Sequence, residues 1–277
     1  MVTGAAGMLG RDVLNAAAAA GLEPIALPRV ELDISDAAAV DAITRELAPD
    51  VVVNCAAFTD VDGAEEKEHQ AVAVNGPGAG NVARAAAAQG AWTIHISSDY
   101  VFDGAKRSPY LESDPTAPES AYGRSKLAGE LAVARSASGR HTIVRSAWLF
   151  GAGGPCFPAT ILRLARQREE LTVVDDQVGC PTFTGHLAPA LVALARDPIE
   201  GIVHVAGGGR CSWYELAGEV VSNAGLSCHV LPGSTAALGR PAPRPAYSVL
   251  RSERPGVPEL PPWREGLAAF MEAGVPS

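Results

Sequence analysis

Short apolar runs alternate with helical segments through the first half of the chain. The apolar runs are rich in β-branched residues and lie at 23–27, 50–54, 91–97 and 141–147. Segments of helical composition lie at 8–20, 36–48, 71–89 and 121–138. Continuous apolar strands are typical of a parallel sheet buried on both faces, and alternation of strands with helices is typical of repeated βαβ units. The pattern therefore predicts an α/β fold with a Rossmann-like, doubly wound parallel sheet.

Three glycines at the start of the chain, Gly4, Gly7 and Gly10, form the pattern GxxGxxG. At a turn from strand to helix, such glycines allow a tight bend and let the backbone approach a pyrophosphate at the helix N-terminus. Their place before a helix favours dinucleotide binding over an ordinary turn. Only residues 1–3 remain for a first strand that normally has about five residues. The expectation is a chain that is truncated or whose start codon was assigned late.

The regular alternation of apolar runs and helical segments ends after residue 150. Proline is dense over 232–262, and the segments there read as helices at 157–168, 184–195 and 212–224, with a short strand at 201–207. We predict an NAD(P)-binding Rossmann domain over residues 1–150 and a smaller C-terminal substrate-binding lobe over residues 151–277. The lobe is not expected to be an independent fold, and some crossing of the chain between the two parts is expected.

Composition excludes several classes of protein. The chain has 277 residues, of which 47% are hydrophobic, and a net charge of −9, which argues against a general nucleic-acid binder. No signal peptide is visible, and the alanine-rich stretches are too short to span a bilayer, so no membrane partner is expected. The five cysteines are scattered without a CxxC or Cys/His cluster. Neither a disulfide framework nor a metal site is indicated, and a cytoplasmic location fits best.

Arg29 follows the second predicted strand, where an NAD-binding protein would carry a carboxylate for the ribose 2′-hydroxyl. Arginine suits the 2′-phosphate of NADP instead. NADPH is therefore the favoured cofactor. A solvated surface arginine is the alternative interpretation, and Glu31 could still serve NAD, so NADH is also possible.

A candidate catalytic set lies at the carboxyl ends of the predicted strands, where ligands of open α/β sheets bind. Ser98 follows the strand at 91–97, and Tyr122 and Lys126 share one face of the next helix, one turn apart. A tyrosine has a pKa of about 10, and a neighbouring ammonium stabilises its phenolate and lowers that pKa. Tyr122 could then act as a general acid. Taken singly, the serine could merely cap a turn and the other two could be surface residues.

The order of glycine loop, post-strand serine and YxxxK resembles the short-chain dehydrogenase/reductase superfamily. Within its extended branch, which acts on nucleotide sugars, the chain is most similar to the dTDP-4-dehydrorhamnose reductase family. The resemblance covers nearly the whole chain. It is carried by the segments 53–65, 73–86, 92–104, 122–130, 144–151, 173–183 and 244–250.

The resemblance implies a role for each matching residue. Ser98, which stands where the family usually has threonine, Tyr122 and Lys126 would be catalytic. The cofactor would be bound by Tyr122 and Lys126 together with Gly4, Gly7, Met8, Leu9, Gly10, Arg29, Asp33, Ile34, Cys55, Ala56 and Ala57. The substrate would be bound by Thr59, Val61, Asp99, Tyr100, Trp148 and Arg244.

The implied activity is NAD(P)H-dependent reduction of the 4-keto group of a dTDP-deoxysugar, with dTDP-4-dehydro-L-rhamnose as the first candidate and a monomer or homodimer as the working form. Another nucleotide-sugar enzyme, an epimerase or a 4,6-dehydratase, is a rival. Dehydratases use an aspartate–glutamate pair, whereas Asp99 is followed here by Tyr100. A non-catalytic regulatory subunit on the same fold is a second rival, because a fold does not determine a function.

Overall fold

A six-stranded parallel sheet forms the centre of the larger lobe in the computed structural model, which describes residues 1–274. Its strand order is β10-β5-β4-β3-β1-β2. The strands are β1 (Val2–Thr3), β2 (Ala26–Leu27), β3 (Val51–Asn54), β4 (Trp92–Ser98), β5 (His141–Ser146) and β10 (Gly201–His204). Central residues such as Val52, Ile94 and Val144 are fully buried. The predicted α/β fold with a doubly wound parallel sheet is confirmed.

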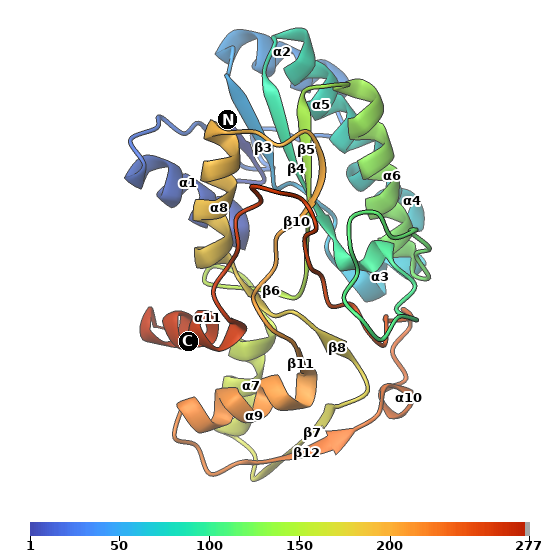
Figure 1. Ribbon diagram of the computed structural model, residues 1–277, viewed down its shortest axis with the longest axis vertical. Coiled ribbons are helices and arrows are strands. Elements are labelled where there is room, and N and C mark those ends of the chain that lie inside the picture. The colour runs from blue at the N-terminus through green and yellow to red at the C-terminus, as the bar shows by residue number, and fades with distance from the viewer. Residues whose placement is uncertain (275–277) are drawn as a thin grey trace.

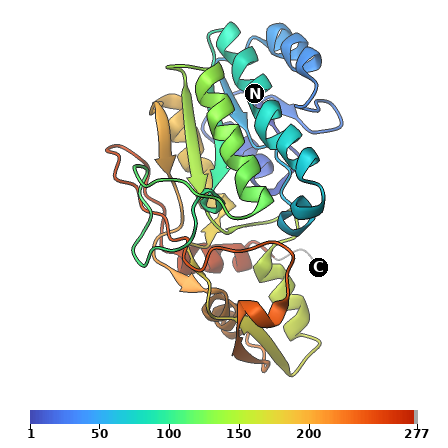
Figure 2. The ribbon, with the colours of Figure 1, turned by 90° about the vertical axis from the view of Figure 1, so that its right-hand side faces the viewer.

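Helices cover both faces of this sheet, as Figures 1 and 2 show. One face carries α1 (Met8–Ala19) and α8 (Thr184–Arg196). The other carries α2 (Ala37–Leu47), α4 (Glu68–Ala73), α5 (Ala79–Ala88) and α6 (Ala121–Ser136), with the short α3 (Val61–Glu66) beside α6. Within residues 1–274, no helix combines the length and the apolar composition that crossing a membrane requires.

Two elements differ from the sequence-based expectation. The strand expected at 23–27 forms only as Ala26–Leu27, because this edge strand can pair only with the two-residue β1. The single helix expected at 71–89 is divided by a π-helical turn, Val74–Gly78. Pro77 lies inside this turn and has no backbone N–H to donate.

The order of the strands reverses between β1 and β3, since the chain continues from β1 to β2 on one side and places β3 on the other. The carboxyl ends of two strands at such a switch point enclose a crevice, which is where open α/β sheets bind ligands. A buried hydrogen-bonded chain joins the strands there. Thr3 Oγ1 donates to Asn54 Oδ1 at 2.7 Å, and Asn54 Nδ2 lies 3.1 Å from His95 Nδ1.

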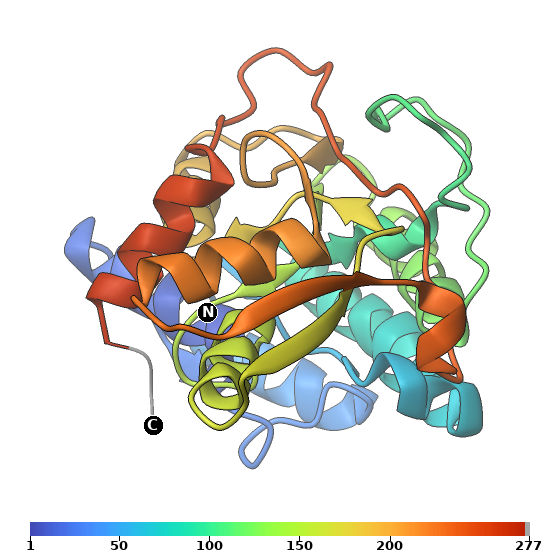
Figure 3. The same cartoon turned by 90° about the horizontal axis from the view of Figure 1, so that it is seen from below.

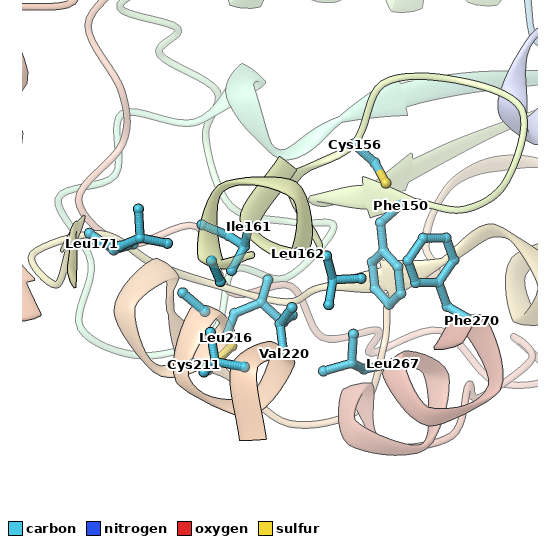
Figure 4. Packing of buried hydrophobic residues seen from close by; sticks show 14 of the residues in the cluster. Phe150, Cys156, Ile161, Leu162, Leu171, Cys211, Leu216, Val220, Leu267 and Phe270 are labelled. Atoms are coloured by element: carbon cyan, nitrogen blue, oxygen red, sulfur yellow. The ribbon is translucent and has the colours of Figure 1, made fainter. Parts of the chain in front are cut away.

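The smaller lobe has its own apolar core, part of which Figure 4 shows. Phe150, Leu162 and Phe270 meet there with Leu216 and Val220. Its elements are β6 (Leu149–Phe150), α7 (Phe157–Ala165), β7 (Glu170–Val174), β8 (Val178–Gly179), β9 (Thr182–Phe183), β11 (Cys211–Ser212), α9 (Trp213–Asn223), β12 (His229–Gly233), α10 (Thr235–Leu238) and α11 (Trp263–Glu272).

The chain passes between the two lobes more than once. It leaves the larger lobe after β5, returns for α8 and β10, and leaves again before α9. Seen from below in Figure 3, α9 lies beside the parallel pair of β7 and β12, with α11 next to it. The residues that connect the lobes therefore pass close to the carboxyl end of the main sheet.

A buried ion pair joins α6 to β5. Arg145 donates to Glu130 through Nε at 2.8 Å and through a terminal nitrogen at 2.7 Å, and both side chains are 2% exposed. Ser97 Oγ donates to the same carboxylate at 2.6 Å. A bidentate pair of this kind is stronger than a neutral hydrogen bond and fixes the orientation of both side chains.

Replacing Arg145 by methionine should lower the free energy of unfolding by about 3–5 kcal/mol, because the Glu130 charge would remain buried without its partner. Denaturation by urea measures the change. Replacing Glu130 by leucine in the same protein should recover much of the loss, since an apolar pair carries no desolvation cost. Arg84→Met, which breaks an exposed pair with Asp41, is the control and should cost at most about 1 kcal/mol. Equal losses for Arg145 and Arg84 would contradict the argument.

Candidate active site

The glycine loop connects β1 to α1 at the switch point of the sheet. Gly4 has a φ of 64°, and a Cβ atom there would lie 2.6 Å from the backbone nitrogen of Ala56. Any larger residue would therefore push β1 and β3 apart. Gly7 caps α1 without a side chain, and the first turn of α1 carries no acidic residue. The backbone N–H groups of Met8 and Leu9 begin the helix there, so this terminus fits the pyrophosphate of a dinucleotide.

The residues predicted for the adenosine end lie beyond β2. Arg29 is 80% exposed and makes only a long contact of 3.7 Å with Asp33, so its guanidinium is accessible to a phosphate. The pKa of Asp33 is lowered by its hydrogen bonds with Ser35. Ile34 packs in the core with 2% of its surface exposed, so its side chain offers little area to a ligand.

Cys55, Ala56 and Ala57 follow β3 and are half-buried beside the glycine loop. Burial raises the pKa of the Cys55 thiol to about 12, so this cysteine is a neutral thiol at physiological pH. Small neutral side chains at the end of β3 leave room along the crevice. The arrangement fits a cofactor groove.

The start of α6 brings Tyr122 next to Ser98. Ser120 caps the helix by accepting a hydrogen bond from the backbone of Gly123 at 3.0 Å. The Ser98 hydroxyl lies beside the Tyr122 phenol and lowers its pKa by hydrogen bonding. Ser98 also donates to Asp99 Oδ1 at 2.9 Å. The structure therefore brings the predicted serine and tyrosine together at the carboxyl end of β4.

Lys126 lies one turn further along α6 and is 2% exposed. Its Nζ donates to the carbonyl oxygen of Ile96 at 2.7 Å. Burial lowers the pKa of Lys126 to about 8, an effect that the nearby Glu130 and Cys55 oppose. An ammonium has three donors, so two remain for other acceptors after the bond to Ile96.

One expectation about Tyr122 is wrong for this structure. Lys126 was expected to lower the pKa of the phenol, whereas the pKa is raised to about 12, by burial first and by the charge of Asp99 second. The desolvation of a phenolate in this pocket outweighs the hydrogen bond from Ser98. Tyr122 is therefore fully protonated at neutral pH.

Asp99 and Tyr100 form a short 3₁₀ turn, Asp99–Val101, directly after β4. Asp99 is 1% exposed, and burial raises its pKa to about 6. Its Oδ2 has no hydrogen-bond partner within residues 1–274, although Ser248 faces the same carboxyl. The ring of Tyr100 packs edge-on against that of Tyr122, with centroids 5.4 Å apart. These two predicted substrate residues thus touch the predicted catalytic ones.

The remaining predicted substrate residues lie on two sides of this centre. Val61 begins α3, with Thr59 exposed just before it. Arg244 donates to both oxygens of Asp62 at 3.0 Å, which ties the C-terminal segment to the start of α3. Trp148 lies further away, between β5 and β6 where the two lobes meet.

Four residues that the sequence analysis did not select also belong to this region. The side-chain amide of Asn75 accepts a hydrogen bond from the backbone N–H of Phe58 and donates one to its carbonyl. The same amide nitrogen donates to Ser125 at 2.9 Å, which fixes the loop after β3 against α6. The others are Glu130, Ser248 and Trp213. Pro77, two residues after Asn75, and the position of Ser248 within the segment 244–250 were usable signals. Nothing in the sequence indicates what Trp213 contacts.

Replacing Asp99 by asparagine should stabilise the protein at pH 7.5 by about 1–3 kcal/mol, because the folded protein then no longer buries a carboxylate. The pKa of Asp99 is raised on folding, so its contribution favours the fold below pH about 4 and is lost as the pH rises through about 6. Denaturation at pH 5 and 7.5 measures this. The variant should lose that part of the pH dependence.

The control for Asp99 is Asp103→Asn. The pKa of Asp103 is lowered by its hydrogen bond from Tyr110, so removing its charge should destabilise the protein at pH 7.5, a change of opposite sign. If Asp99→Asn and Asp103→Asn shift the free energy of unfolding in the same direction, the buried carboxylate of Asp99 does not destabilise the folded protein as proposed.

Comparison with known proteins agrees with the geometry. The RmlD substrate binding domain family matches residues 1–275. A dTDP-4-dehydrorhamnose reductase of Streptomyces griseus is 44% identical over 279 residues, which cover 99% of this chain and 92% of that protein. A probable dTDP-4,6-dihydroxy-2-methyloxan-3-one 4-ketoreductase of Streptomyces antibioticus is 42% identical, with coverages of 99% and 93%. The crystal structure of a dTDP-4-dehydrorhamnose reductase from Bacillus anthracis with NADP superposes with a TM-score of 0.95 at 37% identity, covering 98% of each chain. The chain therefore belongs to the RmlD substrate binding domain family.

Proposed function

We propose that this protein reduces the 4-keto group of a dTDP-deoxysugar with NADPH, and that dTDP-4-dehydro-L-rhamnose is its substrate. The observation that carries the proposal is the position of Ser98, Tyr122 and Lys126. Ser98 and Tyr122 lie side by side at the carboxyl end of β4, and Lys126, one turn further along α6, bonds to Ile96 of the same strand. The glycine loop at the neighbouring switch point fits a dinucleotide. The names of the two Streptomyces relatives and of the Bacillus anthracis structure support a reductase acting on such sugars.

Each residue of the site has a task that follows from its surroundings. When bound, the reduced nicotinamide would supply the hydride. Tyr122 is protonated at neutral pH and would give its proton to the oxygen that gains charge on reduction. Ser98 would donate a second hydrogen bond to that oxygen once its hydroxyl turns away from Asp99.

Lys126 would hold the ribose of the cofactor through the donors that the Ile96 carbonyl leaves free. The protein would thus contribute position and a proton, while the redox chemistry belongs to the cofactor. Location in the cytoplasm and a monomeric or homodimeric form are part of the same proposal.

The test is whether the protein consumes NADPH when dTDP-4-dehydro-L-rhamnose is added. The decrease in NADPH absorbance measures the consumption. Tyr122→Phe should lower kcat by about 100-fold or more, since a positioned general acid contributes about 10²–10⁴-fold. Tyr214→Phe removes a half-exposed phenol of the smaller lobe and should leave kcat unchanged. No consumption by the wild-type protein would overturn the proposed function. Near-normal turnover of Tyr122→Phe would remove that residue from the mechanism.

Preference for NADPH over NADH is expected to depend on Arg29, whose exposed guanidinium could pair with the 2′-phosphate. Arg29→Ala should raise KM for NADPH by about tenfold and leave KM for NADH unchanged, because a hydrogen bond to a charged group contributes about 1.5–3 kcal/mol when well formed. Arg168→Ala, at an exposed position in the smaller lobe, is the control for loss of one positive charge. An unchanged ratio of the two constants in Arg29→Ala would exclude this role.

A further inference from the structure

Trp148 has an unusual backbone for a tryptophan. It lies two residues after β5, whose last residue, Ser146, pairs in register with Ser98. Its φ is 49°, in the left-handed region that residues with a side chain rarely adopt. A strained residue persists only where its surroundings hold it in place, and such residues cluster at functional sites. The structure must therefore contain contacts that hold Trp148 in this conformation.

Trp213 supplies the first of these contacts from the other lobe. The two indole rings are parallel within 3°, and their centroids are 3.5 Å apart. Trp213 is the first residue of α9, and its Nε1 donates to Gln177 Oε1 at 3.0 Å. Phe157 packs against the same ring at 4.5 Å. The ring of Trp213 is thus fixed by a helix start, a hydrogen bond and a second aromatic ring.

Gly179 supplies the second contact. A Cβ atom at this position would lie 2.6 Å from Nε1 of Trp148 and closer still to the ring carbon Cε2. Gly179 pairs with Cys211 across the two short strands β8 and β11, directly before Trp213. One small sheet of the smaller lobe therefore contains Gly179 and leads directly into Trp213, the two residues that enclose the Trp148 indole.

The contacts with Trp213 and Gly179 hold the Trp148 and Trp213 rings in an arrangement that a free pair of rings does not prefer. Free aromatic pairs prefer offset or edge-to-face arrangements over a face-to-face stack. Trp148 stays half-buried, and its indole N–H has no hydrogen-bond partner within residues 1–274. The contacts thus keep a strained residue with a free donor at the junction of the lobes, next to the strand end that carries Ser98.

We propose that Trp213 is a positioning residue for the sugar-binding pocket. Together with Gly179 it holds the Trp148 indole in one orientation, so that the ring and its N–H form a fixed wall against which the dTDP-sugar binds. This inference rests on the proposed function, because it assigns the wall to the same substrate. Trp213 itself acts through Trp148 and does not need to touch the reacting atoms.

The test compares Trp213→Leu and Gly179→Ala with the wild-type protein by two measurements. Two stacked indoles couple their electronic transitions and give a paired positive and negative band in circular dichroism. Both variants should lose or reverse this pair of bands. Calorimetry with dTDP-L-rhamnose should show binding weakened by about tenfold, which corresponds to about 1.4 kcal/mol. The Kd for NADPH should stay within about twofold of the wild-type value.

Three matched variants separate positioning from folding. Trp213→Tyr keeps an aromatic ring and should retain most of the affinity for dTDP-L-rhamnose. Trp92→Phe removes a tryptophan whose Nε1 is bonded to Thr142 in the larger lobe, and it should keep the paired bands. Gly218→Ala adds a methyl group on α9 where nothing lies within 4 Å, and it should change neither measurement.

Variants that lose the paired bands but bind dTDP-L-rhamnose as tightly as the wild type would overturn the inference. Equal weakening of NADPH and dTDP-L-rhamnose would also overturn it, because a general loss of structure would then explain the result. A wild-type protein that binds dTDP-L-rhamnose but consumes no NADPH with the keto sugar would contradict the proposed function alone, and the binding data would still decide the role of Trp213.

Discussion

The hydrogen bond from Lys126 to the carbonyl of Ile96 places a charged group between α6 and the central strand β4. This ammonium is 2% exposed, so α6 must compensate for its desolvation within the protein. One turn further along the helix, Glu130 provides a negative charge, which is itself neutralised by Arg145 on β5 and by a hydrogen bond from Ser97. The helix that carries Tyr122 is thus attached to two strands through charged and polar contacts as well as apolar packing. The register between α6 and the sheet, and hence the place of the site, depends on these contacts.

The smaller lobe completes the site because the chain repeatedly returns to the main sheet. Strand β10 pairs with β5 after an excursion through α7 and α8, so the lobe cannot move far from the sheet without breaking strand pairing. The ion pair between Arg244 and Asp62, at the start of α3, is a second connection between the C-terminal segment and the larger lobe. This pair is partly exposed, and a substrate with a diphosphate could compete with Asp62 for the guanidinium. A fixed sheet edge, together with a lobe held by several chain crossings and a few polar contacts, suits a site that must exclude water after its ligands enter.

The sequence carries local information well and distant contacts poorly. The β-branched runs predicted the strands of the larger lobe because burial on both faces selects those residues wherever they occur. Ser98, Tyr122 and Lys126 could be selected because each lies at a position that the fold itself defines, a strand end or one helical face. Glu130 and Arg145 were missed, since 15 residues separate them and neither lies in a recognisable spacing. The break at the π-helical turn, Val74–Gly78, was missed although Pro77 was visible, because the surrounding alanines favour a helix strongly.

The pKa of Tyr122 is raised in the structure, whereas the sequence predicted that it would be lowered. The spacing of tyrosine and lysine suggested a phenol tuned towards neutrality, but burial and the charge of Asp99 raise its pKa to about 12. Such a phenol can still serve as the acid for a ketone that accepts a hydride. The alkoxide formed is the conjugate base of an alcohol that is about as weak an acid as water, whose pKa is about 15.7. Under the proposed function, proton transfer from Tyr122 would therefore run downhill once the hydride has moved, whereas the uncharged ketone is far too weak a base to take the proton beforehand. A high pKa thus keeps Tyr122 protonated at every physiological pH, and Lys126, which is not among the groups that lower this pKa, would serve by holding the ribose of the cofactor.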